Sequence, residues 1–363
     1  MSHPDRFSAI DHAHMAHALQ LAARGLFTTT PNPRVGCVVV QDGRVVGEGW
    51  HQRAGTPHAE IHALKAAGEA ARGATVYVTL EPCSHHGRTP PCAEALIQAG
   101  VARVVAAMRD PNPLVAGGGI TMLTLAGIQA EIGLMEAETR ALNPGFISRM
   151  TRQRPWVRLK TASSLDGKTA LSNGQSQWIT GEAARADVQQ LRARACAILT
   201  GSGTVLADNP RMNVRDLDIG RQPLRVIVDS RLHTPVDAAI LPALIACHHA
   251  APAARAALEQ AGAEVIELPG VDGRVDLLAL LTLLAQRSVN ELHVEAGAAL
   301  NGALLAAGLI DEWIAYIAPM AVGDSARGLF AQPPLTTLAN AARFRLTDVR
   351  QIGEDLRLTL LPK

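Results

Sequence analysis

Two short segments of this 363-residue chain carry the residue types of a zinc site, and they limit the possible folds more strongly than any other feature. The first is His58-Ala59-Glu60, and the second is Pro82-Cys83, followed by Cys92. Zinc in a hydrolytic site takes three protein ligands and keeps one position for water, which it makes acidic. We therefore predict that His58, Cys83 and Cys92 hold one zinc ion and meet in the fold.

Glu60 follows the ligand histidine by two residues and is expected to act on protons rather than to bind the metal. Its carboxylate can carry a proton from the water to a ring nitrogen or a departing amine, as in zinc deaminases that act on nitrogen heterocycles. In the familiar form of this motif two residues lie between the cysteines, whereas eight residues lie between Cys83 and Cys92. We expect this longer loop to reach over the substrate.

Two alternative roles remain open for these residues. His-x-Glu also occurs by chance, and the histidine is then an ordinary buried side chain satisfied by hydrogen bonds. The Pro-Cys pair, the strand-like run 74–80 and the helix-like run after each ligand segment favour a metal site instead. A purely structural zinc ion would take a fourth protein ligand, and His85 or His86 can supply one.

The composition favours a small-molecule substrate over a nucleic acid. Hydrophobic residues make up 48% of the chain and charged residues 18%, with 34 basic and 33 acidic side chains. The net charge of +1 offers no general surface for a polyanion, and 3% aromatic residues leave little material for stacking on unpaired bases. We expect no nucleic-acid partner.

The chain shows no pattern of membrane insertion or secretion. It has no run of about eighteen apolar residues, and its first residues lack a basic segment followed by an apolar one. We therefore expect no membrane partner and a cytoplasmic location. Of five cysteines, the three outside the zinc motif, Cys37, Cys196 and Cys247, lie in apolar surroundings and are expected to be buried thiols.

The first part of the chain alternates helical and strand-like patterns. We expect a helix over 7–24, a hairpin over 35–50 with a two-residue turn at 42–43, a strand over 75–80 and a strand over 101–108. His58 and Cys92 should each open a helix. A helix N-terminus favours the thiolate form of cysteine, which a metal requires.

The length favours two domains, with the boundary at the polar, basic segment 150–155 that ends in proline. We expect a deaminase domain over 1–149 and a second domain over 150–363. Strand-like runs separated by helical stretches indicate that the second domain is also α/β. These runs are 156–159, 197–200, 224–228, 264–268, 291–294 and 313–317.

Two glycine-containing turns in the second domain each follow a strand. The turn at 295–302 opens a helix, where free amides can bind a phosphate, although close packing of a glycine accounts for it equally well. The turn at 200–204 is similar, and two such loops can flank one nucleotide. Arg192 and Arg215 are candidates for a substrate phosphate, with solvated surface arginines as the alternative.

Longer motifs resemble a known family over nearly the whole chain. The segments 30–33 (TPNP), 79–92 (TLEPCSHHGRTPPC) and 110–113 (DPNP) closely resemble the deaminase half of the bifunctional riboflavin-biosynthesis deaminase/reductases. The segments 164–167 (SLDG), 176–180 (SQWIT), 205–208 (VLAD) and 294–297 (VEAG) resemble its reductase half, in the same order. The resemblance implies a cytidine-deaminase-like three-layer α/β/α domain followed by a dihydrofolate-reductase-like α/β domain.

The resemblance also implies two consecutive reactions. The first is zinc-dependent hydrolytic deamination of 2,5-diamino-6-ribosylamino-4(3H)-pyrimidinone 5′-phosphate. The second is NADPH-dependent reduction of the ribosyl group, which gives 5-amino-6-(5-phosphoribitylamino)uracil. One Zn²⁺ per chain, NADPH and a homodimer or homotetramer are expected by the same resemblance.

The resemblance further assigns binding residues, and it names no reductase acid or base, because hydride transfer needs mainly alignment. The deaminase pocket is expected to include Asn32, His51, His85 and Arg88. The reductase substrate is expected to contact Lys160, Ser176, Arg192, Met212, Arg215 and Glu295. NADPH is expected to contact Ala162, Trp178, Thr204, Asp208, Ser230, Gly297, Ala298, Ala299, Leu300, Asn301, Gly302 and Ala303.

Two rival functions are compatible with parts of the pattern. One is a monofunctional zinc deaminase of free bases, nucleosides or tRNA, whose second domain does not catalyse. The other is a regulatory protein with a structural zinc ion and a nucleotide sensor. The first rival would not oxidise NADPH, whereas the bifunctional enzyme would. The second rival would lose no activity when Glu60 is replaced, whereas a hydrolytic zinc site would.

Overall fold

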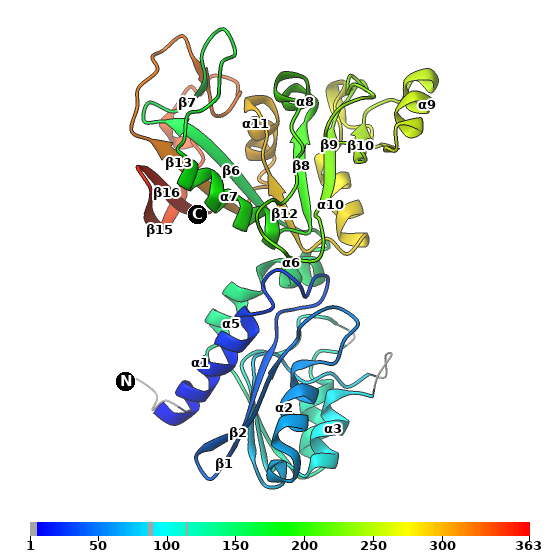
Figure 1. Ribbon diagram of the computed structural model, residues 1–363, viewed down its shortest axis with the longest axis vertical. Coiled ribbons are helices and arrows are strands. Elements are labelled where there is room, and N and C mark those ends of the chain that lie inside the picture. The colour runs from blue at the N-terminus through cyan, green and yellow to red at the C-terminus, as the bar shows by residue number, and fades with distance from the viewer. Residues whose placement is uncertain (1–5, 86–89, 114) are drawn as a thin grey trace. The chain divides into compact units, whose positions relative to one another are not determined.

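The computed structural model describes residues 6–85, 90–113 and 115–363, and its contacts divide the chain into two units, Met1–Gln153 and Arg154–Lys363 (Figure 1). Helix α6 (Pro144–Arg152) runs through the expected boundary at 149/150. The first three residues of the expected linker 150–155 are therefore helical. The physical reason is amphipathicity: Phe146 is buried, and Met150 on the same helix packs against the core of the first unit.

The first unit is built on a five-stranded sheet in the order β2-β1-β3-β4-β5. Strand β1 pairs antiparallel with β2 and β3, whereas β3, β4 and β5 are parallel. The strands are β1 (Gly36–Gln41), β2 (Arg44–Trp50), β3 (Thr75–Val78), β4 (Arg103–Ala106) and β5 (Gln129–Ile132). Asp42 and Gly43 have φ of 51° and 74°, which confirms the predicted primed turn between β1 and β2.

Helices cover both faces of this sheet, so the expected three-layer α/β/α domain is confirmed. In β1, Cys37 and Val39 face the core shared with α2 and α3, whereas Val38 packs on the opposite face with Met15 of α1. Burial on both faces explains why this strand is apolar without alternation. The helices are α1 (Ala9–Ala23), α2 (Ala59–Ala67), α3 (Cys92–Ala99), α4 (Gly118–Leu125) and α5 (Glu136–Leu142), in addition to α6.

Two glycines allow helix α2 to lie directly on strand β2. A Cβ atom on Gly47 would come within 2.2 Å of the Ala63 carbonyl oxygen, and one on Gly49 within 2.6 Å of the Ala59 carbonyl oxygen. The absence of side chains at these two positions therefore sets the spacing between strand and helix. This packing holds the N-terminus of α2, where His58 is the N-cap residue.

The second unit contains a nine-stranded sheet in the order β11-β10-β9-β8-β12-β6-β13-β16-β15. The strands from β11 to β13 are parallel, and the β15–β16 hairpin adds antiparallel to β13. This mixed sheet agrees with the expected dihydrofolate-reductase-like domain. The strands are β6 (Trp156–Ser164), β8 (Ala197–Gly201), β9 (Leu224–Val228), β10 (Leu244–Cys247), β11 (Glu264–Glu267), β12 (Glu291–Val294), β13 (Glu312–Ala318), β15 (Phe344–Ile352) and β16 (Asp355–Pro362), with β7 (Lys168–Ala170) and β14 (Arg327–Gly328) forming a separate pair.

Helices flank the second sheet on both faces. Leu280 and Leu284 of α10 pack on one face, together with Leu304 of α11, whereas Ala184 and Val188 of α7 pack beside β13 on the other. The helices are α7 (Glu182–Arg194), α8 (Ser202–Asp208), α9 (Pro252–Gln260), α10 (Leu277–Gln286) and α11 (Ala298–Ala306).

The sequence patterns missed strands β5, β7, β10 and β14 and the β15–β16 hairpin. Strand β10 is only four residues long and contains alanine, so its pattern does not differ from that of a helix. The hairpin strands carry charged residues on one side, and most of their side chains are exposed or half-buried, so no continuous apolar run marks them. The environment of Cys196 also differs from the expectation: Cys37 and Cys247 are buried, whereas Cys196 is only half-buried.

In the part of the chain that the structure describes, no helix is long and apolar enough to cross a membrane.

We expect Gly49→Ala to destabilise the first unit by about 1–3 kcal/mol, because the added methyl group overlaps the backbone of α2. Hydrogen–deuterium exchange of the β1 and α2 amides measures this loss within the unit. The matched control is Val45→Ala on the same strand, whose side chain is 42% exposed. Equal exchange protection in both variants would contradict the close packing of α2 on β2.

Candidate functional site

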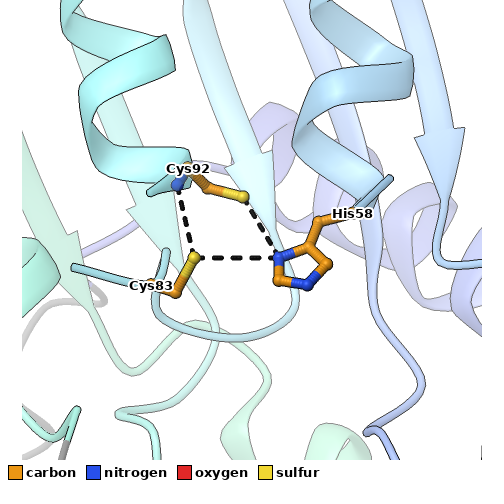
Figure 2. Close-up of side chains that lie close together, drawn as sticks. All are labelled: His58, Cys83 and Cys92. Atoms are coloured by element: carbon orange, nitrogen blue, oxygen red, sulfur yellow. Dashed lines mark hydrogen bonds between the residues drawn. The ribbon is translucent and has the colours of Figure 1, made fainter. Parts of the chain in front are cut away.

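The three predicted metal ligands converge at the ends of two helices (Figure 2). His58 precedes α2, Cys92 is the first residue of α3, and Cys83 lies in the loop after β3. The His58 Nδ1 atom is 3.3 Å from the Cys92 sulfur and 3.7 Å from the Cys83 sulfur. All three ligand atoms lie within 4.8 Å of one another.

This geometry fits a tetrahedral zinc ion. With Zn–S distances of about 2.3 Å and a Zn–N distance of about 2.0 Å, nitrogen and sulfur ligands lie roughly 3.5 Å apart. The two nitrogen–sulfur distances lie on either side of that value. The donor set of one imidazole and two thiols also suits zinc, so His58 Nδ1, Cys83 Sγ and Cys92 Sγ are the atoms that would hold it.

The surroundings of the sulfurs favour a thiolate. The backbone N–H of Cys92, at the start of α3, donates a hydrogen bond to the Cys83 sulfur at 3.3 Å. Hydrogen bonding from Cys92 and His58 outweighs burial and lowers the pKa of Cys83 to about 4. The neighbouring Cys83 sulfur and burial raise the pKa of Cys92.

Glu60 lies against the metal-ligand cluster and is almost completely buried, with 3% of its surface exposed. Its carboxyl lies close to the Cys92 sulfur. Burial raises the pKa of Glu60 to about 7, while the charge of His58 opposes that shift. A carboxyl with such a pKa exchanges protons near neutral pH, as a group that both accepts and returns a proton must.

Asn32 and His51 lie next to the ligands and contact each other. The His51 ring packs edge-on against the His58 ring, with centroids 5.4 Å apart. Its Nδ1 atom donates to the Pro57 carbonyl oxygen at 3.3 Å, so Nε2 of the neutral ring accepts from the Asn32 amide nitrogen at 3.1 Å. Burial lowers the pKa of His51, which favours this neutral form.

The other two expected deaminase residues are not brought into this cluster. His85 is exposed, and its charge acts on the buried Asp110 carboxyl. Arg88 lies outside the described residues, as does His86. Among the residues that the structure describes, only His58, Cys83 and Cys92 group as metal ligands, and His85 is not the fourth ligand that a structural zinc site would take.

Glu81 is a supporting residue that the sequence patterns missed. It directly precedes Pro82-Cys83 and is buried. Its carboxylate accepts hydrogen bonds from the backbone N–H groups of Asp110, Gly117 and Ile120 at 3.0–3.2 Å. This carboxylate therefore ties the ligand loop to the 110–120 segment. An acidic residue adjacent to a ligand in an otherwise apolar segment is the signal that marks it.

A second candidate site in the second unit is a cavity of about 970 Å³. It lies along the carboxyl ends of β6, β12, β8 and β9, where parallel sheets place their ligands. Seventeen of the eighteen reductase residues expected from the sequence line it. These are Lys160, Ala162, Ser176, Trp178, Arg192, Thr204, Asp208, Met212, Arg215, Ser230, Glu295, Gly297, Ala298, Ala299, Leu300, Asn301 and Ala303.

The remaining expected residue, Gly302, is absent from the cavity lining and has a packing role. A Cβ atom there would lie 2.1 Å from the Ala331 carbonyl oxygen. Close packing therefore accounts for this glycine, whereas Gly297 is the N-cap of α11 and lines the cavity. The close-packing role expected for the 295–302 turn thus occurs at Gly302, whereas phosphate binding by this turn stays a prediction.

The cavity is strongly basic although the whole chain is nearly neutral. Seven basic residues line it and only two acidic ones, Asp208 and Glu295. Such a wall attracts phosphate groups, and the N-terminus of α11 adds free amide donors to it. The basic residues are Lys160, Arg185, Arg192, Arg211, Arg215, Arg274 and Arg327.

Glu295 and Arg192 form a half-buried, bidentate ion pair in the wall of the cavity. The guanidinium Nε and Nη2 atoms lie 2.5 Å and 3.0 Å from the two carboxylate oxygens. His293, fully buried behind the pair, lies 3.2 Å from the same carboxylate. Although burial opposes the charge, Arg192 and His293 hold the pKa of Glu295 well below its usual value. Burial lowers the pKa of Lys160, the neighbouring cation.

More charged side chains, paired with one another, lie beyond this ion pair on the same face of the sheet. Arg158 is 1% exposed and donates to Glu291 at 3.0 Å and to Glu312 at 2.8 Å. Arg194 completes the group by donating to Glu291 at 2.7 Å. The alternation Glu-Leu-His-Val-Glu in β12 is the sequence signal for this polar face, although the run by itself predicts only a strand.

We expect Glu81→Gln to weaken zinc retention, because the NH2 group that replaces one carboxylate oxygen cannot accept from the backbone N–H groups that face it. The loss of such a charged hydrogen-bond acceptor costs about 1.5–3 kcal/mol. Competition with a chromophoric chelator measures the zinc affinity directly, independently of turnover. Glu69→Gln, an exposed change in the same unit, is the control and should retain zinc as the unchanged protein does. Equal retention in both variants would show that Glu81 does not position the ligand loop.

Comparison with known proteins identifies both units. Residues 8–108 match the family described as cytidine and deoxycytidylate deaminase zinc-binding region, and residues 155–358 match the RibD C-terminal domain. The riboflavin biosynthesis protein RibD of Escherichia coli (strain K12) is 51% identical over 97% of this chain and 99% of its own. The corresponding protein of Haemophilus influenzae is 46% identical over 98% of this chain and 99% of its own.

Solved structures agree over the whole length. Acinetobacter baumannii RibD, form 1, superposes with a TM-score of 0.91 at 48% identity, covering 98% of this chain and 99% of that one. A deaminase/reductase from Thermotoga maritima superposes with a TM-score of 0.85 at 33% identity, covering 98% and 99%. The chain belongs to the RibD family of riboflavin biosynthesis, in which a zinc-dependent deaminase is joined to an NADPH-dependent reductase.

Proposed function

We propose that the first unit deaminates 2,5-diamino-6-ribosylamino-4(3H)-pyrimidinone 5′-phosphate and that the second reduces the ribosyl group of the product with NADPH. The Thermotoga maritima relative is described as a diaminohydroxyphosphoribosylaminopyrimidine deaminase and 5-amino-6-(5-phosphoribosylamino)uracil reductase. One observation carries the proposal for this chain: it combines a three-ligand zinc cluster beside a buried carboxyl with a basic, nucleotide-sized cavity.

In the deaminase, Glu60 is the proton carrier and the neighbouring residues orient the pyrimidine. His58, Cys83 and Cys92 would hold the zinc ion, which would supply a water molecule of lowered pKa. Glu60 takes the proton of the nucleophile and delivers it to the departing amine. The Asn32 amide nitrogen is engaged with His51, so its carbonyl oxygen is left to accept from a substrate N–H group. His85 and Arg88 are proposed to complete the substrate pocket.

In the reductase, binding and alignment account for the chemistry. NADPH supplies the hydride, and the Gly297–Ala299 segment at the start of α11 is proposed to hold its pyrophosphate. Lys160 and Glu295 are proposed to contact the pyrimidine, with Arg192 and Arg215 nearby for the substrate phosphate. The Arg192–Glu295 ion pair pre-orients both side chains before the substrate arrives.

We propose a homodimer or homotetramer assembled through the β15–β16 hairpin. The pairing register places Leu346, Val349, Leu356 and Leu358 on one face of the hairpin. The first three of these are 42–51% exposed. A contiguous apolar face on an exposed hairpin is typical of a protein–protein interface.

We propose a cytoplasmic location for this enzyme. All five cysteines are free of disulfide bonds, and two of them are the proposed zinc ligands. A reducing compartment keeps such thiols available to the metal.

A two-substrate assay tests the two activities separately. With the diaminopyrimidine phosphate, Glu60→Gln should lower ammonia release about 10²- to 10⁴-fold and abolish NADPH oxidation, which depends on the first product. With the deaminated phosphate, the same variant should oxidise NADPH at the normal rate. Zinc content should stay at one ion per chain. Ammonia release at the normal rate would contradict the proposed role of Glu60 and favour a structural zinc site.

Arg192→Lys is the reciprocal variant. It keeps the positive charge but loses the bidentate geometry with Glu295, so NADPH oxidation should fall at least about tenfold. Ammonia release should be unchanged. Ammonia release by the unchanged protein without any later NADPH oxidation would instead favour a monofunctional deaminase.

The proposed assembly is tested by Val349→Asp, which places a charge on the exposed apolar face of the hairpin. We expect a shift towards the monomer in size-exclusion chromatography with multi-angle light scattering. Arg345→Ala, an exposed change on the same strand, should leave the mass unchanged. An unchanged mass for Val349→Asp would contradict assembly through this face.

A further inference from the structure

The cavity of the second unit extends beyond the substrate-binding end to the end of β9, where the sequence motifs assigned Ser230 but no basic residue. In the sheet, β6, β12, β8 and β9 are consecutive neighbours. Lys160 lies at the β6 end of the cavity wall, and Ser230 lies just past the end of β9. With about 4.8 Å between neighbouring strands, these ends are three intervals, or about 14 Å, apart.

This inference rests on the proposed cofactor site. An extended dinucleotide bound there lies along this span, and the cavity sets its orientation. The amides at the start of α11 follow β12, in the middle of the span, and suit the pyrophosphate. The reacting ring must meet the substrate between Lys160 and Glu295. The adenosine half therefore lies towards β9, near Ser230.

At this β9 end, Arg274 belongs to the cavity lining, and its side chain is exposed. Its backbone is held in place: the Arg274 carbonyl oxygen accepts from the Gly270 N–H at 2.8 Å and from His248 Nδ1 at 3.1 Å. The backbone N–H of His248 donates to the Ser230 carbonyl oxygen at 3.2 Å. His248 thus links the segments that carry Ser230 and Arg274.

We infer that Arg274, together with the Ser230 hydroxyl, binds the adenosine 2′-phosphate and makes the reductase prefer NADPH to NADH. In the described part of the chain, no ion pair occupies the Arg274 guanidinium, which offers five donors and no acceptor. Such a group binds a phosphate dianion through charge-assisted hydrogen bonds, and its hydrogen bond to a neutral 2′-hydroxyl is much weaker. Arg231 and His233, which follow Ser230 within three residues, are exposed as Arg274 is, but unlike Arg274 they do not belong to the cavity lining.

Isothermal titration calorimetry with 2′,5′-ADP and 5′-AMP tests this assignment, because the two probes differ only in the 2′-phosphate. Arg274→Ala should weaken binding of 2′,5′-ADP about ten- to a hundredfold and change 5′-AMP binding less than about threefold. In turnover with the deaminated phosphate, kcat/KM should fall for NADPH and stay constant for NADH. Arg274→Lys should retain part of the NADPH preference.

Arg231→Ala is the matched control and should bind both probes as the unchanged protein does. Unchanged 5′-AMP binding and unchanged turnover with NADH show that the second unit of Arg274→Ala folds, and ammonia release by the first unit should also be normal. Equal weakening of both probes would mean that Arg274 contacts the adenine or ribose, and no weakening would mean that it contacts neither; each result overturns the inference. An unchanged protein that binds neither probe would instead contradict the proposed cofactor site itself.

Discussion

Both sites exist because strands pair in parallel in the two sheets. Neighbouring parallel strands end at the same edge of a sheet, so the loops that follow them meet there. In the first unit, Cys83 follows β3 and Cys92 opens the helix that leads to β4. In the second unit, the ends of β6, β12, β8 and β9 form one cavity wall. Residues far apart in the chain thereby become neighbours.

Helix N-termini at these edges place backbone N–H donors where negative charge is bound. The first amide of α3 donates to the Cys83 sulfur, and Gly297 at the start of α11 lines the basic cavity. Both features stabilise negative charge, a thiolate in one unit and phosphate in the other. Buried charges in the second unit are tolerated because they are paired, as with Arg158 between Glu291 and Glu312. The same polar face then continues to Glu295 and Arg192 at the cavity.

Much of the fold was predictable because the local signals agreed with one another. The β1–β2 turn contains Asp42-Gly43, the helix at His58 begins where its pattern indicated, and β9 and β12 have the predicted limits. The β15–β16 hairpin escaped prediction because it has little buried surface of its own. Local alternation marks a strand only when one of its faces is buried and the other is not.

The chemistry of the chain follows from its sequence: a histidine, two cysteines and a glutamate form one pattern, and ordered motifs resemble a family whose reductase residues, except Gly302, line the second cavity. The residues that support this chemistry emerge only when the chain is folded. The roles of Glu81 and Arg274 follow from no local pattern, since their partners lie 20 or more positions away or are backbone groups. Gly302 belongs to the same turn as Gly297 but packs against Ala331. Contacts of this kind depend on how elements pack, which local sequence does not encode.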